Sequence, residues 1–185
     1  MTFLYFAYGS NMLPARLKAR CASARVIGPA TAKGFRLDFS KRSTDGSGKA
    51  TLIVHEGAAP GVLFEIAKSD LAPLDRAEGA GKGYDRVDGF RVVNAVTREP
   101  ITATTYLASA PEADLKPFDW YLALVIAGAH HHALGDQHLA ELRLIEWLND
   151  DDFRRKSRIE ALQALTAHGF DDHYVLLEDP LLGEN

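Results

Sequence analysis

Residues 4–11 read LYFAYGSN, and the run from 3 to 8 is apolar or aromatic throughout. Such a run, without alternation of polar and apolar side chains, is typical of a strand buried on both faces. It ends on Gly9, Ser10 and Asn11, and a buried strand that turns at once into a helix leaves backbone N–H groups that can hold an anion. The simpler interpretation is an ordinary turn in which Ser10 or Asn11 caps the helix, and the residues alone favour it.

Composition sets the class of protein. The chain has 185 residues, a formal net charge of -4 and 46% hydrophobic residues, which is ordinary for a globular protein. Its mildly acidic balance argues against binding to nucleic acid, which requires a basic surface. Cys21 is the single cysteine, so no internal disulfide can form, and a cytoplasmic location is expected. No stretch approaches the roughly 20 apolar residues of a membrane span, so we expect no membrane partner.

The order of the predicted elements indicates the fold class. Side chains alternate over 33–41, which predicts a half-buried strand. Further strands are predicted at 3–8, at 50–55 and 61–66 as a hairpin joined by EGAAP, and at 85–96 and 101–108 as a hairpin joined by TREP. Helices are predicted at 12–20, 69–77, 118–133, 136–148 and 152–167. Because most helices follow the strands, we predict an α+β fold with a mixed or antiparallel sheet that can close into a small barrel. The length favours a single domain over 1–185.

Glu78 is the candidate with the clearest physical rationale. In the predicted helix it follows Leu71 and Leu74 at helical spacing, so it lies on the apolar stripe that faces the core. Gly79 is the expected stop, which puts the acid at the negative end of the helix dipole, and Asp75 adds like charge. A carboxylate whose charge is disfavoured in these ways is a candidate for a functional site. A frayed last turn, with the side chain reaching water, fits the sequence equally well.

Other candidate groups have simpler interpretations. Tyr106 shares a strand face with Thr102 and Thr104, and that face lines either a polar pocket or, more commonly, solvent. The run 130–132 is three histidines, but consecutive helical side chains point about 100° apart and cannot share one ion. We therefore expect no metal site.

Three motifs together resemble those of the γ-glutamylcyclotransferase family. They are FAYGSNM at 6–12, LDRAEG at 74–79 and TTYLA at 104–108, and the helix at 117–134 is similar to one that follows the family's last strand. The likeness covers 2 to about 148, with a C-terminal helix and tail at about 149–185. It implies a small β-barrel surrounded by helices, and it allows a homodimer.

The resemblance also implies a reaction and its residues. A γ-glutamyl amide is converted to 5-oxoproline and a free amino acid or amine, without a cofactor or a metal. By its place in LDRAEG, Glu78 is the implied general acid/base. The implied substrate-binding residues are Tyr5, Phe6, Ala7, Tyr8, Gly9, Ser10, Tyr84 and Tyr106, and Tyr121 matches a tyrosine at the start of the late helix.

Two alternatives remain open from the sequence. One is a γ-glutamylamine cyclotransferase, in which only the pocket for the leaving group differs. The other is a protein that binds a γ-glutamyl metabolite without converting it, against which the presence of Glu78 argues. A serine hydrolase that uses Ser10 is disfavoured, because Ser10 lies outside a G-x-S-x-G turn and no base is placed beside it.

Overall fold

The computed structural model describes residues 1–178, and the last part of the expected tail lies outside them. The strands are β1 (Thr2–Ala7), β2 (Arg25–Arg42), β3 (Gly48–Ala67), β4 (Tyr84–Asn94) and β5 (Pro100–Ala108). The α-helices are α1 (Pro14–Lys18), α2 (Leu71–Glu78), α3 (Asp119–His131), α4 (Asp136–Arg143), α5 (Lys156–Thr166) and α6 (Tyr174–Leu177). Two 3₁₀ turns, η1 (Ser10–Met12) and η2 (Lys68–Asp70), precede α1 and α2.

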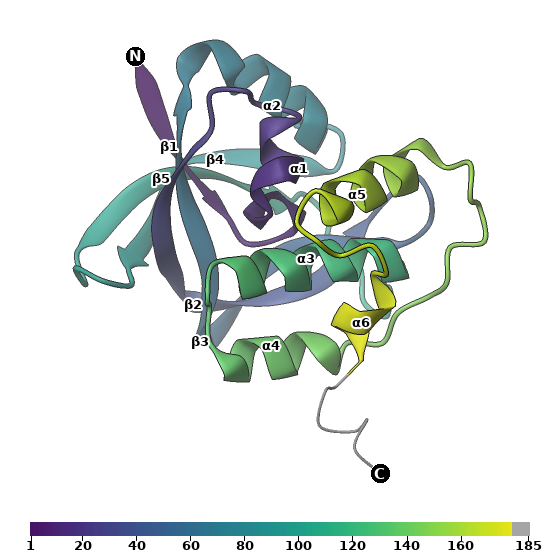
Figure 1. Ribbon diagram of the computed structural model, residues 1–185. Helices are drawn as coiled ribbons and strands as arrows, with labels where there is room; N and C mark the ends of the chain where they lie inside the picture. The colour runs from purple at the N-terminus through teal and green to yellow at the C-terminus, as the bar shows by residue number, and fades with distance from the viewer. Residues whose placement is uncertain (179–185) are drawn as a thin grey trace.

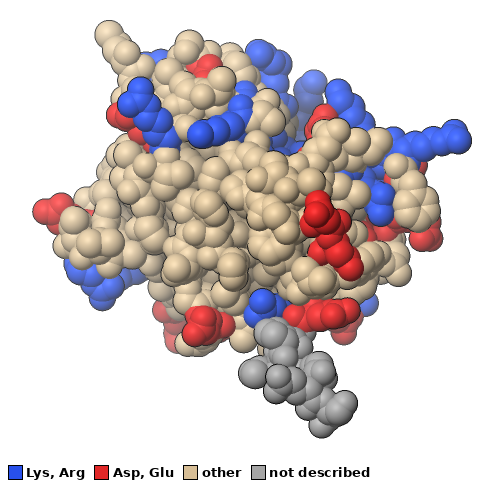
Figure 2. Space-filling view, viewed as in Figure 1, with Lys and Arg blue, Asp and Glu red and all other residues tan. Residues whose placement is uncertain are grey.

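The five strands form a closed barrel in the order β1-β3-β2-β4-β5. All its pairings are antiparallel except the closing one, in which β1 lies parallel to β5 with Tyr5 opposite Thr104. Figure 1 shows helices α3 to α6 gathered on one side of the molecule, with the β2–β3 ribbon passing behind α3. In the space-filling view from the same side (Figure 2), Lys and Arg side chains lie mainly along the upper part of this face. The predicted α+β class and the mixed barrel are thus confirmed.

The two longest strands differ from the prediction. The sequence EGAAP at 56–60 was expected to connect two strands, 50–55 and 61–66, as a hairpin. Instead β3 runs unbroken through it, because β2 also extends to Arg25 and pairs along its length, with Ala58 opposite Lys33 and Pro60 opposite Thr31. Cross-strand pairing has overridden the local turn signal of Gly and Pro. The second expected hairpin, joined by TREP, is confirmed as β4 and β5.

Helix α3 forms the centre of the helical layer. Every residue from Asp119 to Ala129 is buried, so this helix is covered on all sides. Gly128 lets the N-terminal segment approach closely, because a Cβ there would lie 2.7 Å from the Cβ of Met12. No helix within residues 1–178 combines the length and the apolar character that a membrane crossing requires.

Candidate active site

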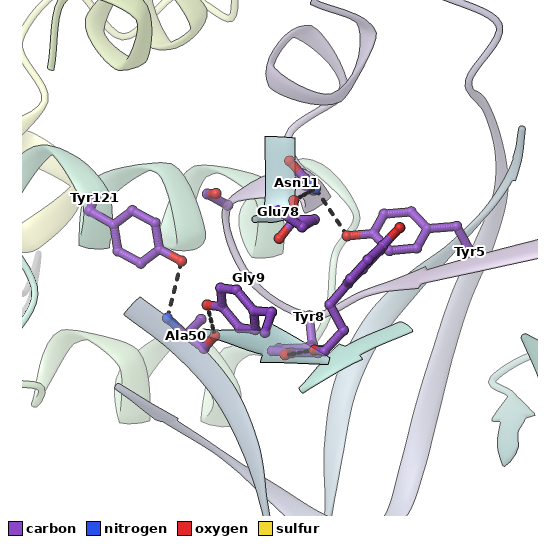
Figure 3. Close-up of a pocket in the computed structure, with 10 residues that line it drawn as sticks. Tyr5, Tyr8, Gly9, Asn11, Ala50, Glu78 and Tyr121 are labelled. Atoms are coloured by element: carbon purple, nitrogen blue, oxygen red, sulfur yellow. Dashed lines mark hydrogen bonds between the residues drawn. The ribbon is translucent and has the colours of Figure 1, made fainter. Parts of the chain in front are cut away.

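A cavity opens where β1 runs into η1, and it collects residues from distant parts of the chain (Figure 3). We call it the tyrosine cavity, because five tyrosines line it. Its lining residues are Tyr5, Tyr8, Gly9, Ser10, Asn11, Ala50, Glu78, Tyr84, Tyr106 and Tyr121. The strand β1 and the turn after it supply half of this lining, which explains why the chain places a rigid buried strand before the three small residues.

Glu78 brings the only carboxylate into this lining, from the last turn of α2. Its Oε1 accepts hydrogen bonds from Asn11 Nδ2 at 2.6 Å and from Arg20 Nη1 at 2.9 Å, and its side chain is 13% exposed. Arg20 also donates to Asn11 Oδ1 at 2.8 Å, so the three side chains hold one another in place. Both contacts fall on Oε1, and among the described residues Oε2 has no hydrogen-bond partner.

The expected surroundings of Glu78 are changed in two ways. The Arg20 guanidinium, which the sequence did not indicate, supplies a positive charge next to the carboxylate. Asp75 is turned to other partners, because it accepts from the Tyr106 hydroxyl at 2.7 Å and pairs with Arg86 Nη1 at 2.7 Å. The expected helix stop is confirmed, since Gly79 has a left-handed conformation with φ 66°.

The backbone of Ala50 fixes two of the tyrosines. Tyr84 donates its hydroxyl to the Ala50 carbonyl at 2.5 Å, and the Ala50 N–H donates to the Tyr121 hydroxyl at 3.1 Å. On the opposite side Tyr8 donates to the carbonyl of Tyr106, and Asn11 donates to the Tyr5 hydroxyl at 3.0 Å. These pairings hold the rings in fixed positions around the cavity (Figure 3).

The tyrosine hydroxyls are neutral in this cavity. Burial raises the pKa of all five, and the nearby Glu78 carboxylate adds to the effect in each. A phenol with a raised pKa keeps its proton at physiological pH and can donate it in a hydrogen bond. Tyr8, Tyr84 and Tyr106 already donate their protons to protein acceptors, whereas Tyr5 and Tyr121 only accept among the described residues. The site therefore combines one carboxylate with two neutral hydroxyls that can donate to a ligand.

The turn after β1 is shaped by a close approach. A Cβ on Gly9 would lie 2.8 Å from the Cβ of Ala50, so only glycine fits without a displacement. The backbone N–H groups of Gly9 and Ser10 have no acceptor among the described residues. They are available to a carboxylate or to the oxygen of a reacting carbonyl.

The structure brings most of the residues implied by the resemblance to this one cavity. Two of them lie elsewhere, because Phe6 and Ala7 are buried in the core, where the Phe6 ring packs against Phe90. Neither lines the cavity. Arg20 and Ala50 were not indicated as site residues, because they carry no local signal and only the fold places them here. Asn11 was expected in the turn with anion-binding N–H groups, but the contact of its side chain with Glu78 was not foreseen.

The histidine run, Cys21 and Ser10 lie among groups that do not activate them for chemistry. The ring of His132 is bonded to the carbonyl of Met12 at 2.9 Å, and within residues 1–178 no three His, Cys, Asp or Glu side chains are grouped so as to hold a metal ion. Burial raises the pKa of the Cys21 thiol to about 11, so it is protonated and unreactive. Ser10 lies close to Tyr121, and no histidine lines the tyrosine cavity to activate it.

Comparisons with known proteins identify the family of this chain. Residues 5–123 match the family described as gamma-glutamyl cyclotransferase, AIG2-like. The chain is 32% identical over 155 residues to the human protein named gamma-glutamylcyclotransferase, and 33% identical over 151 residues to that of the mouse, covering 78% of this chain and 79% of each relative. A solved structure named gamma-glutamyl cyclotransferase superposes with a TM-score of 0.78 at 29% identity, covering 88% of this chain and 99% of that one.

Proposed function

Because this chain belongs to the gamma-glutamyl cyclotransferase, AIG2-like family, we propose that it is a γ-glutamylcyclotransferase. In the reaction, the substrate's own α-amine attacks its γ-glutamyl amide carbonyl. A carbon–nitrogen bond forms in the five-membered ring, the original amide bond breaks, and the products are 5-oxoproline and the free amine. Neither water nor an external nucleophile is consumed, so the enzyme has only to position the substrate and move protons.

Glu78 is the residue that we propose moves the protons. The substrate ammonium must lose a proton before it attacks, and the leaving nitrogen must gain one before it departs. A single carboxylate can do both in turn. The observation that carries this proposal is the geometry of Glu78, in which Asn11 and Arg20 fix Oε1 while Oε2 has no partner among the described residues.

The rest of the cavity serves to fold the substrate into the reacting geometry. Ring closure is intramolecular, and correct orientation alone can lower such a barrier by roughly 7–11 kcal/mol. The tyrosine rings hold the γ-glutamyl chain, and the N–H groups of Gly9 and Ser10 are the donors that we propose for the α-carboxylate or the developing oxyanion. The neutral hydroxyls of Tyr5 and Tyr121, which donate to no described residue, can add hydrogen bonds to the substrate without competing for the proton.

Product analysis tests this function directly. The purified protein is incubated with a panel of γ-glutamyl amides, with amino-acid, peptide and simple amine leaving groups, and 5-oxoproline and glutamate are quantified. We expect 5-oxoproline and the released amine in equal amounts, with no glutamate. Glutamate as the main product would indicate a hydrolase, and binding without any product would indicate the non-catalytic alternative.

A further inference from the structure

A second cavity, of about 230 Å³, adjoins the tyrosine cavity and shares Ser10, Glu78, Tyr84 and Tyr121 with it. We call it the outer cavity. Its charged lining residues are Arg16, Arg20, Lys41, Lys49, Asp45 and Glu78. Four positive and two negative groups give it a net charge of +2, although the chain as a whole carries -4. A cavity with this local excess attracts anionic groups.

Two of these cations already have close partners. Arg20 is paired with Glu78 at 2.9 Å, and Lys49 Nζ lies 3.2 Å from the Asp45 carboxylate and over the rings of Trp120 and Tyr121. The excess positive charge is therefore carried by the other two, Arg16 and Lys41.

Arg16 is buried without an adequate partner. Its side chain is 8% exposed, and its nearest carboxylate, on the half-exposed Glu160, lies 3.6 Å from Nη1. Its Nε is buried and has no hydrogen-bond partner among the described residues. Burial lowers the pKa of Arg16 to about 10, with the charge of Arg20 adding to the effect. A guanidinium held this way costs stability, and an anionic ligand is what would compensate it.

Lys41 is the second surplus cation. Its ammonium lies 5.0 Å from the centroid of the Tyr84 ring, and no ion pair is formed with any carboxylate of residues 1–178. Its aliphatic stem passes Gly83, where a Cβ would lie 2.9 Å from Lys41 Cε. The glycine thus leaves room for the lysine to extend along a tyrosine that both cavities share.

We propose that the outer cavity holds the leaving group of the substrate, and that Arg16 and Lys41 bind a carboxylate on it. This inference rests on the proposed function. Glu78, which protonates the leaving nitrogen in that function, lines both cavities. With the γ-glutamyl part in the tyrosine cavity, the leaving group extends past Glu78 into the outer one. The positive lining selects leaving groups that carry a carboxylate, and it disfavours those that carry a second amine.

A matched pair of substrates tests this selection. γ-Glutamyl-alanine and γ-glutamyl-alaninamide have the same size, and only the first has a carboxylate on its leaving group. Hydrogen bonds to a charged group are stronger than those between neutral groups, so we expect the parent protein to prefer the acid by about 10–100-fold in kcat/KM. In Arg16→Met and in Lys41→Met the preference should fall severalfold, through a higher KM for the acid and an unchanged KM for the amide.

Lys18→Met is the control, because Lys18 is exposed on the same helix as Arg16 and lines neither cavity. Thermal denaturation establishes whether each variant is folded. If Arg16→Met does not fold, Lys41→Met alone tests the inference. A parent protein that converts both substrates equally, or variants that keep the parent's preference, would overturn the inference while leaving the proposed function standing. If the parent forms no 5-oxoproline from any γ-glutamyl amide, the proposed function fails instead.

Discussion

Replacing Glu78 by Gln keeps the shape of the side chain and removes its charge and its ability to accept a proton. In the parent protein, Asn11 Nδ2 and Arg20 Nη1 lie 2.6 and 2.9 Å from Glu78 Oε1, and the Gln carbonyl oxygen can still accept hydrogen bonds from both. Each bond changes from a charged to a neutral acceptor, a loss of up to about 1 kcal/mol. The Arg20 and Glu78 side chains are partly exposed, at 21% and 13%, so the total loss in the free energy of unfolding should be about 1–2 kcal/mol. That corresponds to a melting temperature lower by about 2–8 °C, and the protein should stay folded.

The effect on the rate should be much larger. Loss of general acid–base catalysis costs about 10²–10⁴ in rate, equivalent to about 2.7–5.4 kcal/mol in the activation barrier. KM should change less, because the tyrosines and the N–H groups of Gly9 and Ser10 still contact the substrate in the proposed function. The assay is 5-oxoproline formation at saturating γ-glutamyl-alanine, with circular dichroism and thermal melting on the same samples.

Asp70→Asn is the matched control for this change. Asp70 immediately precedes the same helix and accepts two hydrogen bonds, from the Ser23 N–H at 3.0 Å and the Ser23 hydroxyl at 2.6 Å, but it lies outside the cavity. Its neutralisation should leave turnover at the parent level. If a folded Glu78→Gln protein also turned over at near the parent rate, Glu78 would be a structural residue and the proposed mechanism would be refuted.

Two further predictions concern the turn and the histidines. Gly9→Ala places a Cβ 2.8 Å from Ala50 Cβ, so the turn must shift at a cost of about 1–3 kcal/mol in the free energy of unfolding, which urea denaturation measures. Steady-state kinetics of 5-oxoproline formation should show a raised KM, and an unchanged KM would contradict the proposed role of the turn. Burial lowers the pKa of His132 and of His138 below their unfolded value, so the unfolded chain takes up protons more readily. The stability that these two neutral histidines allow should therefore be fully present above about pH 6.5, and the free energy of unfolding should fall as the pH drops below that value. Urea midpoints at successive pH values test this, and a midpoint that rises on acidification would refute it.

Local sequence patterns correctly predicted the strands and helices whose own residue patterns favour the structure that they adopt in the fold. The alternation in 33–41, the apolar run 3–8 and the helical spacing near Glu78 all appear as strands or helices close to the expected places. The pattern failed at 56–60, where Gly and Pro indicated a turn. There the backbone groups are satisfied by the neighbouring strand along a ladder that no local signal shows.

The sequence by itself was enough to single out the main candidate residues, because the buried strand, the small residues after it and the acid Glu78 on an apolar helix stripe are all local features. Only the tertiary structure decided how they act. Barrel closure and the packing of α1 bring Asn11 and Arg20, which precede Glu78 by 67 and 58 residues, to one oxygen of its carboxylate and leave the other without a described partner. The same packing buries Arg16 with its Nε unsatisfied among the described residues and with the half-exposed Glu160, at 3.6 Å, as its ion-pair partner. Contacts between residues far apart in sequence depend on how the whole chain buries its apolar surface, and no short stretch encodes them.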